Sequence, residues 1–451
     1  MNRFITFLSL LVSVCTFAQT PLEAETAESP VRQITLEQAL QVALDENASV
    51  QLAELEIKRV GYARKGSYAA LFPQIDGSAS FQRTIKKQKM YIDMPGMEGA
   101  DGIEVGRYNT WSAGITASMP VVNAALWKSL QISGEDVELA VEKARGSRLE
   151  TVGQVKKAYY GVLLAKEVCR VYREVYENAL TNYQQIERRY HVQKASELDL
   201  TRAKTTLAGA IPNVYDSENA VSLALWQLKA VMGIDLESGI DTAGNLLDHA
   251  AEMGSGIRAD EAFSLENNSS LKQLDIQARQ LADMVKMQAY AYIPSLSLMF
   301  SYAVNAMENT FEFQQYKWSP YSYVGLSLNI PIFSGGKRLN NVRAAKVQAA
   351  ELDIQRTNAE RQLSIAIRQS LNTMDTATKS YAAARSAEES AGKAYGIARK
   401  SYDVGRSTLT DLNDAQLALT QSRLGVCQAV YSFLAARSEL ETALGNDFTG
   451  K

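Results

Sequence analysis

Four short segments of the chain alternate between apolar and mostly small polar side chains, which is the period-two pattern of β-strands. They cover residues 75–82, 111–119, 295–304 and 324–330. Each is about ten residues long, the length of a strand that crosses a bilayer in a barrel. The apolar positions are Ile75, Gly77, Ala79 and Phe81; Trp111, Ala113, Ile115, Ala117 and Met119; Leu296, Leu298, Phe300, Tyr302 and Val304; and Val324, Leu326, Leu328 and Ile330.

This alternation fits a membrane barrel or a half-buried sheet in a soluble protein. The other faces hold mainly Ser, Thr, Gly and Asn, which a wet lumen tolerates, and this favours the barrel. Four strands cannot close a barrel, which needs about eight, and an open edge in hydrocarbon leaves backbone groups unpaired. A membrane sheet of this kind must therefore be completed by further copies of the chain. The segments 84–110 and 305–320 are interpreted as exposed outer loops.

Long helices follow each pair of strands. No proline occurs from Gly336 to Val404, and about 65 residues of helix span roughly 100 Å. Small and apolar residues at steps of three and four predict a coiled-coil seam along this helix. The seam comprises Val342, Ala345, Ala349, Leu352, Ala359, Leu363, Ala366 and Ser370.

A second helix is expected to return from about Ser407 to Leu444, with Gly405 in the turn, where a positive φ is useful. In the first half of the chain, the turn falls at residues 193–195 and contains no glycine. Pro212 lies inside the return helix of that half and predicts a kink.

The two halves of the chain repeat the same landmarks with an offset of roughly 210 to 220 residues, far longer than a solenoid repeat. This predicts a duplicated unit of helix, strand, loop, strand and a long helical hairpin. The matched landmarks are Glu46-Asn47 with Glu266-Asn267, Phe72-Pro73 with Ile293-Pro294, Gly114 and Pro120 with Gly325 and Pro331, Tyr190, Asp199, Leu200 and Ala203 with Tyr402, Asp411, Leu412 and Ala415, and Met232-Gly233 with Leu444-Gly445.

Composition narrows the function further. The chain has 451 residues, 9 of them Pro, and a net charge of −3, which gives no reason to expect a nucleic-acid partner. Its 2 His residues leave little for a histidine metal site or a histidine general base. Because no nucleophile elbow, phosphate loop or metal-binding spacing is present in the sequence, we expect no enzyme activity and no cofactor.

The N-terminus predicts export. One basic residue, an apolar run and the small residues Thr16 and Ala18 match a secretory signal cleaved after Ala18. Cleavage before a lipidated Cys15 is an alternative. Cys169 and Cys427 lie in apolar helical patterns, so buried free thiols are favoured over a periplasmic disulfide.

These signals divide the chain into successive segments. The predicted segments are a signal peptide (1–18), an N-terminal linker (19–33), a first repeat (34–245), an inter-repeat linker (246–259), a second repeat (260–446) and a C-terminal tail (447–451).

The mature chain resembles the TolC-like outer-membrane efflux proteins. The motifs that carry the resemblance are Ile34-Thr35-Leu36-Glu37-Gln38-Ala39-Leu40 with Ala43-Leu44 and Asn47; Phe72-Pro73 and Ile293-Pro294; Tyr402-Asp403-Val404-Gly405; and Asp411-Leu412-Asn413-Asp414-Ala415. The resemblance implies a mainly α-helical chain whose long coiled-coil hairpins form a periplasmic tunnel. It also implies a homotrimer in which each chain gives four strands to a shared 12-stranded β-barrel in the outer membrane.

By the same resemblance, the protein is an exit channel of a tripartite efflux or type I secretion system, docked to a periplasmic adaptor and an inner-membrane transporter. Asp411 and Asp414 would form a cation-selecting gate at the tunnel mouth, where crowding should raise some of their pKa values. The implied tip latch comprises Asp199, Tyr402, Arg406 and Ser407, although Ser407 stands where the family has an arginine. The candidate adaptor contacts are Gln193, Lys194, Ala195 and Gly405.

A periplasmic coiled-coil adaptor or tether is the alternative function. It accounts for the long helices, but it gives the four amphipathic strands no role.

Overall fold

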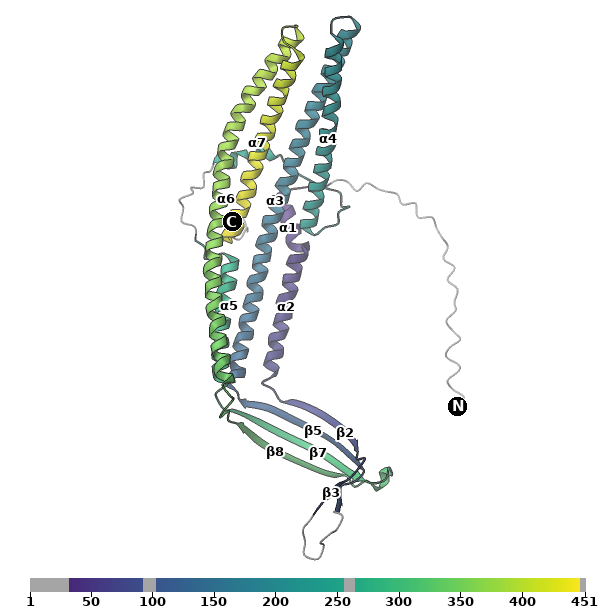
Figure 1. The fold of residues 1–451 in the computed structure, drawn as a ribbon, viewed down its shortest axis with the longest axis vertical. Coiled ribbons are helices and arrows are strands. Elements are labelled where there is room, and N and C mark those ends of the chain that lie inside the picture. Colours follow the sequence, from purple (N-terminus) through teal and green to yellow (C-terminus); the bar gives the residue numbers. More distant parts are fainter. Residues whose placement is uncertain (1–31, 92–102, 255–263, 447–451) are drawn as a thin grey trace, which may run out of the picture.

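The computed structural model describes residues 32–91, 103–254 and 264–446. The predicted signal peptide with Cys15, most of the N-terminal linker and the C-terminal tail lie outside the described residues. Two long helical hairpins stand side by side, and a four-stranded sheet lies at the end opposite their tips (Figure 1).

The sheet contains the four predicted strands in the order β2-β5-β7-β8, all antiparallel to their neighbours. The strands are β2 (Gln74–Arg83), β5 (Asn109–Val122), β7 (Ser295–Glu308) and β8 (Ser319–Asn329). β5 continues through Pro120, with a register irregularity before Val122, and so ends later than its sequence pattern predicts. Within the described chain, β2 and β8 are the two edges of the sheet.

The loops at the far end of the sheet contain short regular elements. The first loop contains a two-stranded hairpin of β3 (Gln88–Met90) and β4 (Ile103–Val105). The second contains the short 3-10 helix η2 (Phe313–Gln315). Tyr316, which follows η2, is buried, so this second segment is not the wholly exposed loop that its sequence predicts.

The helices confirm the duplication. α3 (Ala124–His191) has 68 residues and α6 (Lys337–Asp403) has 67. Their return helices α4 (Glu197–Met232) and α7 (Leu409–Leu444) each have 36 residues, and α4 remains one continuous helix through Pro212. α2 (Ala48–Ala69) and α5 (Ser269–Tyr290) each have 22 residues; α2 packs against α3, and α5 packs against both α3 and α6.

A short connecting region surrounds the middle of the helices. α1 (Leu36–Glu46) begins with the predicted capping box, in which Thr35 and Gln38 each hydrogen-bond the other's backbone amide. β1 (Arg32–Ile34) pairs in parallel with β6 (Ile240–Thr242). η1 (Leu246–Gly254) occupies most of the predicted inter-repeat linker and buries Leu246 and Met253.

The hydrophobic core lies at this middle level, where helices from both halves meet. Burial of apolar side chains here supplies the main stabilising free energy of the helical part. Among its fully buried members are Ala39, Ala43, Val155, Val162, Leu228, Met232 and Val430.

Two details of the sequence analysis are corrected by the structure. The N-caps of α2 and α5 are Asn47 and Asn268, so Asn47 corresponds to Asn268 and not to Asn267. In the predicted seam of α6, Ala345, Leu352 and Ser370 are buried, but the seam shifts from Ala366, which is exposed, to Ile367.

Cys169 and Cys427 are free and buried, as the sequence favours, and burial raises the pKa of the Cys427 thiol to about 11. Among the helices of the described ranges, none has a stretch both long and apolar enough to cross a bilayer.

Candidate functional site at the hairpin tips

Both hairpins close with the same backbone motif. At the first tip, the Lys194 amide donates to the Arg189 carbonyl oxygen at 2.7 Å; at the second, the Arg406 amide donates to the Ser401 carbonyl oxygen at 2.8 Å. Each motif needs one left-handed residue. Gly405 has φ 76°, which confirms the predicted role of this glycine, and Gln193 has φ 58° at the equivalent position.

Each tip also presents an acidic residue in the first turn of the return helix, beside the hydroxyl group of the N-cap residue. The Ser196 hydroxyl lies 2.7 Å from Oδ2 of Asp199, and the Thr408 hydroxyl lies 2.7 Å from Oδ2 of Asp411. The Thr408 amide also donates to Oδ2 of Asp411 at 2.9 Å. The two predicted site residues Asp199 and Asp411 are therefore equivalent positions of the duplicated unit.

The hydrogen bonds from Thr408 favour the ionised form of Asp411. Donation from the side chain and then the backbone of Thr408 lowers the pKa of this carboxyl group. The pKa of Asp411 is thus lowered within one chain, whereas crowding of carboxylates in a ring of several chains should raise some of their pKa values. Asp414 is one turn further along α7, and both carboxylates are exposed.

A small apolar cluster joins the two tips. Ile186 of α3, Ala203 of α4 and Leu409 of α7 are buried together. Tyr402 of α6 packs against this cluster, and so do Tyr183, Ala195 and Leu200 of the first hairpin. Burial raises the pKa of the Tyr402 hydroxyl; the positive charge of Arg189 opposes this, and Asp199 adds to it. The negative charge of Asp199 thus acts on Tyr402, and both are predicted latch residues.

Arg189 is a tip residue that the sequence analysis did not identify. Its Nη2 donates to the backbone carbonyl of Asp403 at 3.1 Å and lies 3.9 Å from the Asp403 carboxylate. Its guanidinium carbon is 5.6 Å from the ring centroid of Tyr402. A basic residue in the last turn of α3, beside the acidic end of α6, was the available signal.

The other two predicted latch residues make their hydrogen bonds within the second hairpin. Arg406 is exposed, and its amide takes part in the turn described above. The Ser407 hydroxyl donates to the carbonyl oxygen of Ala398 at 3.3 Å. A further bond between the hairpins comes from Asn413, whose Nδ2 lies 3.4 Å from the Thr206 hydroxyl.

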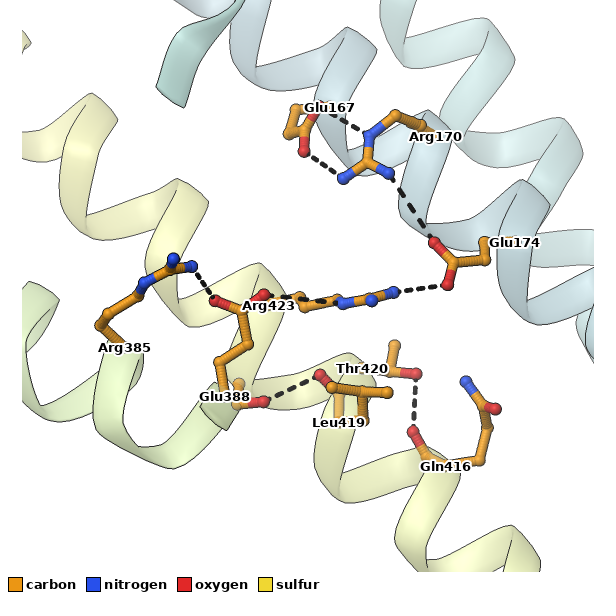
Figure 2. Close-up of polar contacts among 10 residues, drawn as sticks. Glu167, Arg170, Glu174, Arg385, Glu388, Gln416, Leu419, Thr420 and Arg423 are labelled. Atoms are coloured by element: carbon orange, nitrogen blue, oxygen red, sulfur yellow. Dashed lines mark hydrogen bonds and ion pairs between the residues drawn. The ribbon is translucent and has the colours of Figure 1, made fainter. Parts of the chain in front are cut away.

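Further from the tips, a chain of charged side chains links α3, α7 and α6 (Figure 2). Arg423 of α7 donates to Glu174 of α3 at 2.7 Å and lies 3.7 Å from Glu388 of α6. Glu174 is also 3.7 Å from Arg170, which pairs with Glu167. Arg423 is thus the cation that joins the first hairpin to both helices of the second.

Clusters of carboxylates can also hold metal ions. In the described ranges, however, no group of three or more His, Cys, Asp or Glu side chains is placed to do so.

Comparison with known proteins gives a consistent result. The family model described as "Outer membrane efflux protein" matches residues 39–234 and 263–446. The outer membrane protein TolC of Vibrio cholerae is 22% identical over 340 residues, which cover 74% of this chain and 76% of TolC. The alkaline protease secretion protein AprF of Pseudomonas aeruginosa is 22% identical over 343 residues, covering 75% and 70%.

Among solved structures, the outer membrane channel CmeC of Campylobacter jejuni has the same fold. The two chains align with a TM-score of 0.73 at 20% identity, over 91% of this chain and 85% of CmeC. The protein is accordingly an outer-membrane exit channel for efflux or secretion. This function gives its four strands a role, whereas a periplasmic tether does not. With matches in both of its halves, this chain belongs to the outer membrane efflux protein family.

Proposed function

We propose that three copies of this chain assemble into one duct, with a shared barrel of twelve strands in the outer membrane and a helical tunnel in the periplasm. The observation that carries this proposal is the pair of sheet edges, β2 and β8, at opposite sides of a four-stranded sheet. Pairing β2 of one copy with β8 of the next satisfies both edges, and three copies exceed the roughly eight strands that closure requires.

The tips of the hairpins form the periplasmic mouth in this proposal. Asp411 and Asp414 are exposed on one face of α7, and three copies would bring six carboxylates around the opening. Such a ring attracts cations and repels anions. The contacts of Arg189 with Tyr402 and Asp403 act as the latch that holds the two hairpins of each chain together, and the charge of Asp199 also acts on Tyr402.

The same tips are the proposed contact for a periplasmic adaptor and an inner-membrane transporter. The turns at Gln193–Ala195 and at Gly405 are exposed or half-buried ends of the helical part, furthest from the sheet (Figure 1). The name of the relative AprF refers to secretion of an alkaline protease, and that of CmeC to an outer membrane channel.

Conductance in planar bilayers tests the gate. Replacing both Asp411 and Asp414 by asparagine removes the negative charge, and the new amide beside Thr408 retains an oxygen that can accept the capping bonds. We expect the preference for cations over anions to fall strongly. Glu389→Gln, an exposed change on α6, is the matched control. Unchanged selectivity in the double variant would contradict the gate.

Cross-linking tests the adaptor contact. Lys194→Cys and Arg406→Cys place one reactive thiol at each tip, while the native Cys169 and Cys427 are buried. We expect cross-links to a periplasmic protein from these positions and none from a thiol placed at Lys346, on the sheet-proximal part of α6. Equal cross-linking from all three positions would reject a specific tip contact.

A further inference from the structure

The far end of the sheet carries a cluster of aromatic side chains from three separate segments. The ring centroids of Phe81 (β2) and Trp111 (β5) are 4.5 Å apart. From the loop between β7 and β8, Phe311 lies 6.0 Å from Phe81 and Phe313 lies 5.4 Å from Trp111. Tyr316 stacks on Phe313 at 5.4 Å. We call these five residues the rim cluster.

Hydrogen bonds fix the loop in this position. The Asn109 side chain donates to the carbonyl oxygen of Thr310 at 3.1 Å, and the Tyr316 hydroxyl donates to the same oxygen at 2.8 Å. The Tyr108 amide donates to the side chain of Asn309 at 3.2 Å. These hydrogen bonds hold the loop, and with it the rim cluster, against the start of β5.

The strand register places the rim cluster on the apolar face of the sheet. Phe81 is opposite Trp111, and Trp111 is opposite Ala306. Ile115, on the same face of β5, is opposite Tyr302. Since side chains alternate between faces, these residues share one side with the exposed Ile75 and Val324. In a channel with a wet lumen this side contacts lipid, and its far end is the outer-leaflet end because the helices leave from the other end (Figure 1).

A cation lies directly beyond the aromatic rings. Arg83 is two residues after Phe81 and so is on the same face; its partner in the register is Asn109. Its guanidinium carbon is 5.0 Å from the ring centroid of Phe311. Arg83 is exposed and, in the part of the chain that the structure describes, makes no ion pair with a carboxylate. Nearby Arg107, in contrast, lies 3.9 Å from Glu308.

We propose that Arg83 and the rim cluster bind the phosphate-bearing headgroup of an outer-leaflet lipid. The guanidinium group holds the phosphate through paired hydrogen bonds, and the rings pack against the sugar or glycerol part at the depth where amphipathic aromatic residues are favoured. The acyl chains then follow the apolar face toward Ile115 and Phe300. Lys87, whose ammonium is 4.2 Å from the Tyr108 ring centroid, adds a second positive charge near this rim.

Lipid binding to the purified full-length channel tests the proposal. Native mass spectrometry in detergent micelles would compare diphosphoryl lipid A with the same lipid after removal of its phosphates. For Arg83→Gln we expect roughly five- to tenfold weaker binding of the phosphorylated lipid, since one charge-assisted contact is lost. Arg83→Lys should recover part of the affinity. Arg361→Gln, an exposed change on α6, should bind as the unmodified protein does.

Three results would overturn the proposal. One is equal binding of phosphorylated lipid by the Arg83→Gln variant. Another is equal binding of the two lipids by the unmodified channel, which would reduce the rim cluster to a hydrophobic girdle. The third is full displacement of the phosphorylated lipid by millimolar inorganic phosphate alone, which would mean that the site binds free phosphate and does not recognise the lipid. If Arg83→Gln fails to assemble, Phe311→Ala replaces it, with an expected loss of roughly two- to fivefold. Ion conductance should not change in these variants, so the lipid site and the channel function are tested separately.

Discussion

The Nδ2 atom of Asn47 donates a hydrogen bond to the carbonyl oxygen of Val231 at 2.7 Å. The Oδ1 atom of the same side chain accepts from the Ser49 amide at 2.8 Å. One asparagine therefore satisfies the start of α2 and the end of α4, where those helices meet end to end. Asn268 repeats the arrangement in the second half, with its Nδ2 2.7 Å from the Ala443 carbonyl oxygen.

Replacing Asn47 separates these two roles. Asn47→Ala removes both the cap and the bond to Val231, and we expect a loss of about 1–3 kcal/mol in the stability of the helical part. Asn47→Ser keeps a capping oxygen but cannot reach Val231, so the loss should be smaller. Thermal unfolding of the assembled channel in detergent measures both. Equal losses would mean that the capping oxygen contributes nothing and that the contact with Val231 accounts for the whole effect.

The two tip turns offer a matched pair of substitutions. Gln193→Gly relieves a left-handed residue at φ 58°, and we expect the first hairpin to gain about 1 kcal/mol. Gly405→Ala imposes the same strain on the second tip, where an added Cβ meets no atom, and should cost a similar amount. Amide hydrogen exchange at each tip measures the local effect. Opposite signs at the two tips are the expected result.

Arg189 supplies the charged part of the tip latch. Arg189→Gln weakens the contacts with Asp403 and with the Tyr402 ring, so we expect the tips to separate more often and the single-channel conductance to rise. Arg188, the neighbouring residue, is exposed and donates to Gln184 of its own helix. Arg188→Gln is therefore the control. A rise in both variants would assign the effect to net charge alone.

Arg423 sits between two carboxylates. Arg423→Met leaves Glu174 and Glu388 without this cation, and we expect a loss of about 1 kcal/mol because the three side chains are only partly buried. Adding Glu174→Gln should recover part of the loss, since it removes one of the two carboxylates that Arg423 contacts. A double-mutant cycle on thermal unfolding gives the coupling. Purely additive effects would exclude a direct interaction.

The cap at Asp411 predicts a dependence on pH. Its pKa is lowered in the folded chain from an ordinary value of 3.8, so its stabilising contribution is complete above that value and disappears as pH falls through the lower, folded value. Amide exchange in the first turn of α7 should therefore quicken in strong acid relative to α4. Asp411→Asn should remove this dependence. A dependence that persists in the variant would come from another group.

Much of the fold could be predicted from the sequence because its elements are long and periodic. The four strands, the helix from Lys337 to Asp403 and the turn at Gly405 all follow from alternation, missing prolines and one well-placed glycine. The predicted match of Asn47 with Asn267 was wrong by one residue. Asn267 and Asn268 are adjacent, and the sequence alone does not show which of them is the N-cap of α5.

The site was less accessible to such reasoning. Asp199, Tyr402 and Asp411 were identified through the resemblance, but the contact from Arg189 depends on how two hairpins lie beside each other. No periodic pattern encodes that placement. The rim cluster could not be predicted from the sequence for a similar reason. Phe311 and Phe313 lie in a segment whose apolar and polar residues do not alternate, and only the folded loop brings this segment to Phe81 and Trp111.

The near-equal lengths of α3 and α6 constrain how this protein can change during evolution. A difference of one residue, 68 against 67, amounts to about 1.5 Å along the axis, so both tips finish at nearly the same height above the sheet. An insertion of one turn in only one hairpin would raise that tip by roughly 5 Å and give a docking protein a stepped rim. Lengthening of the periplasmic part must therefore occur in matched pairs, one insertion in each half of the gene.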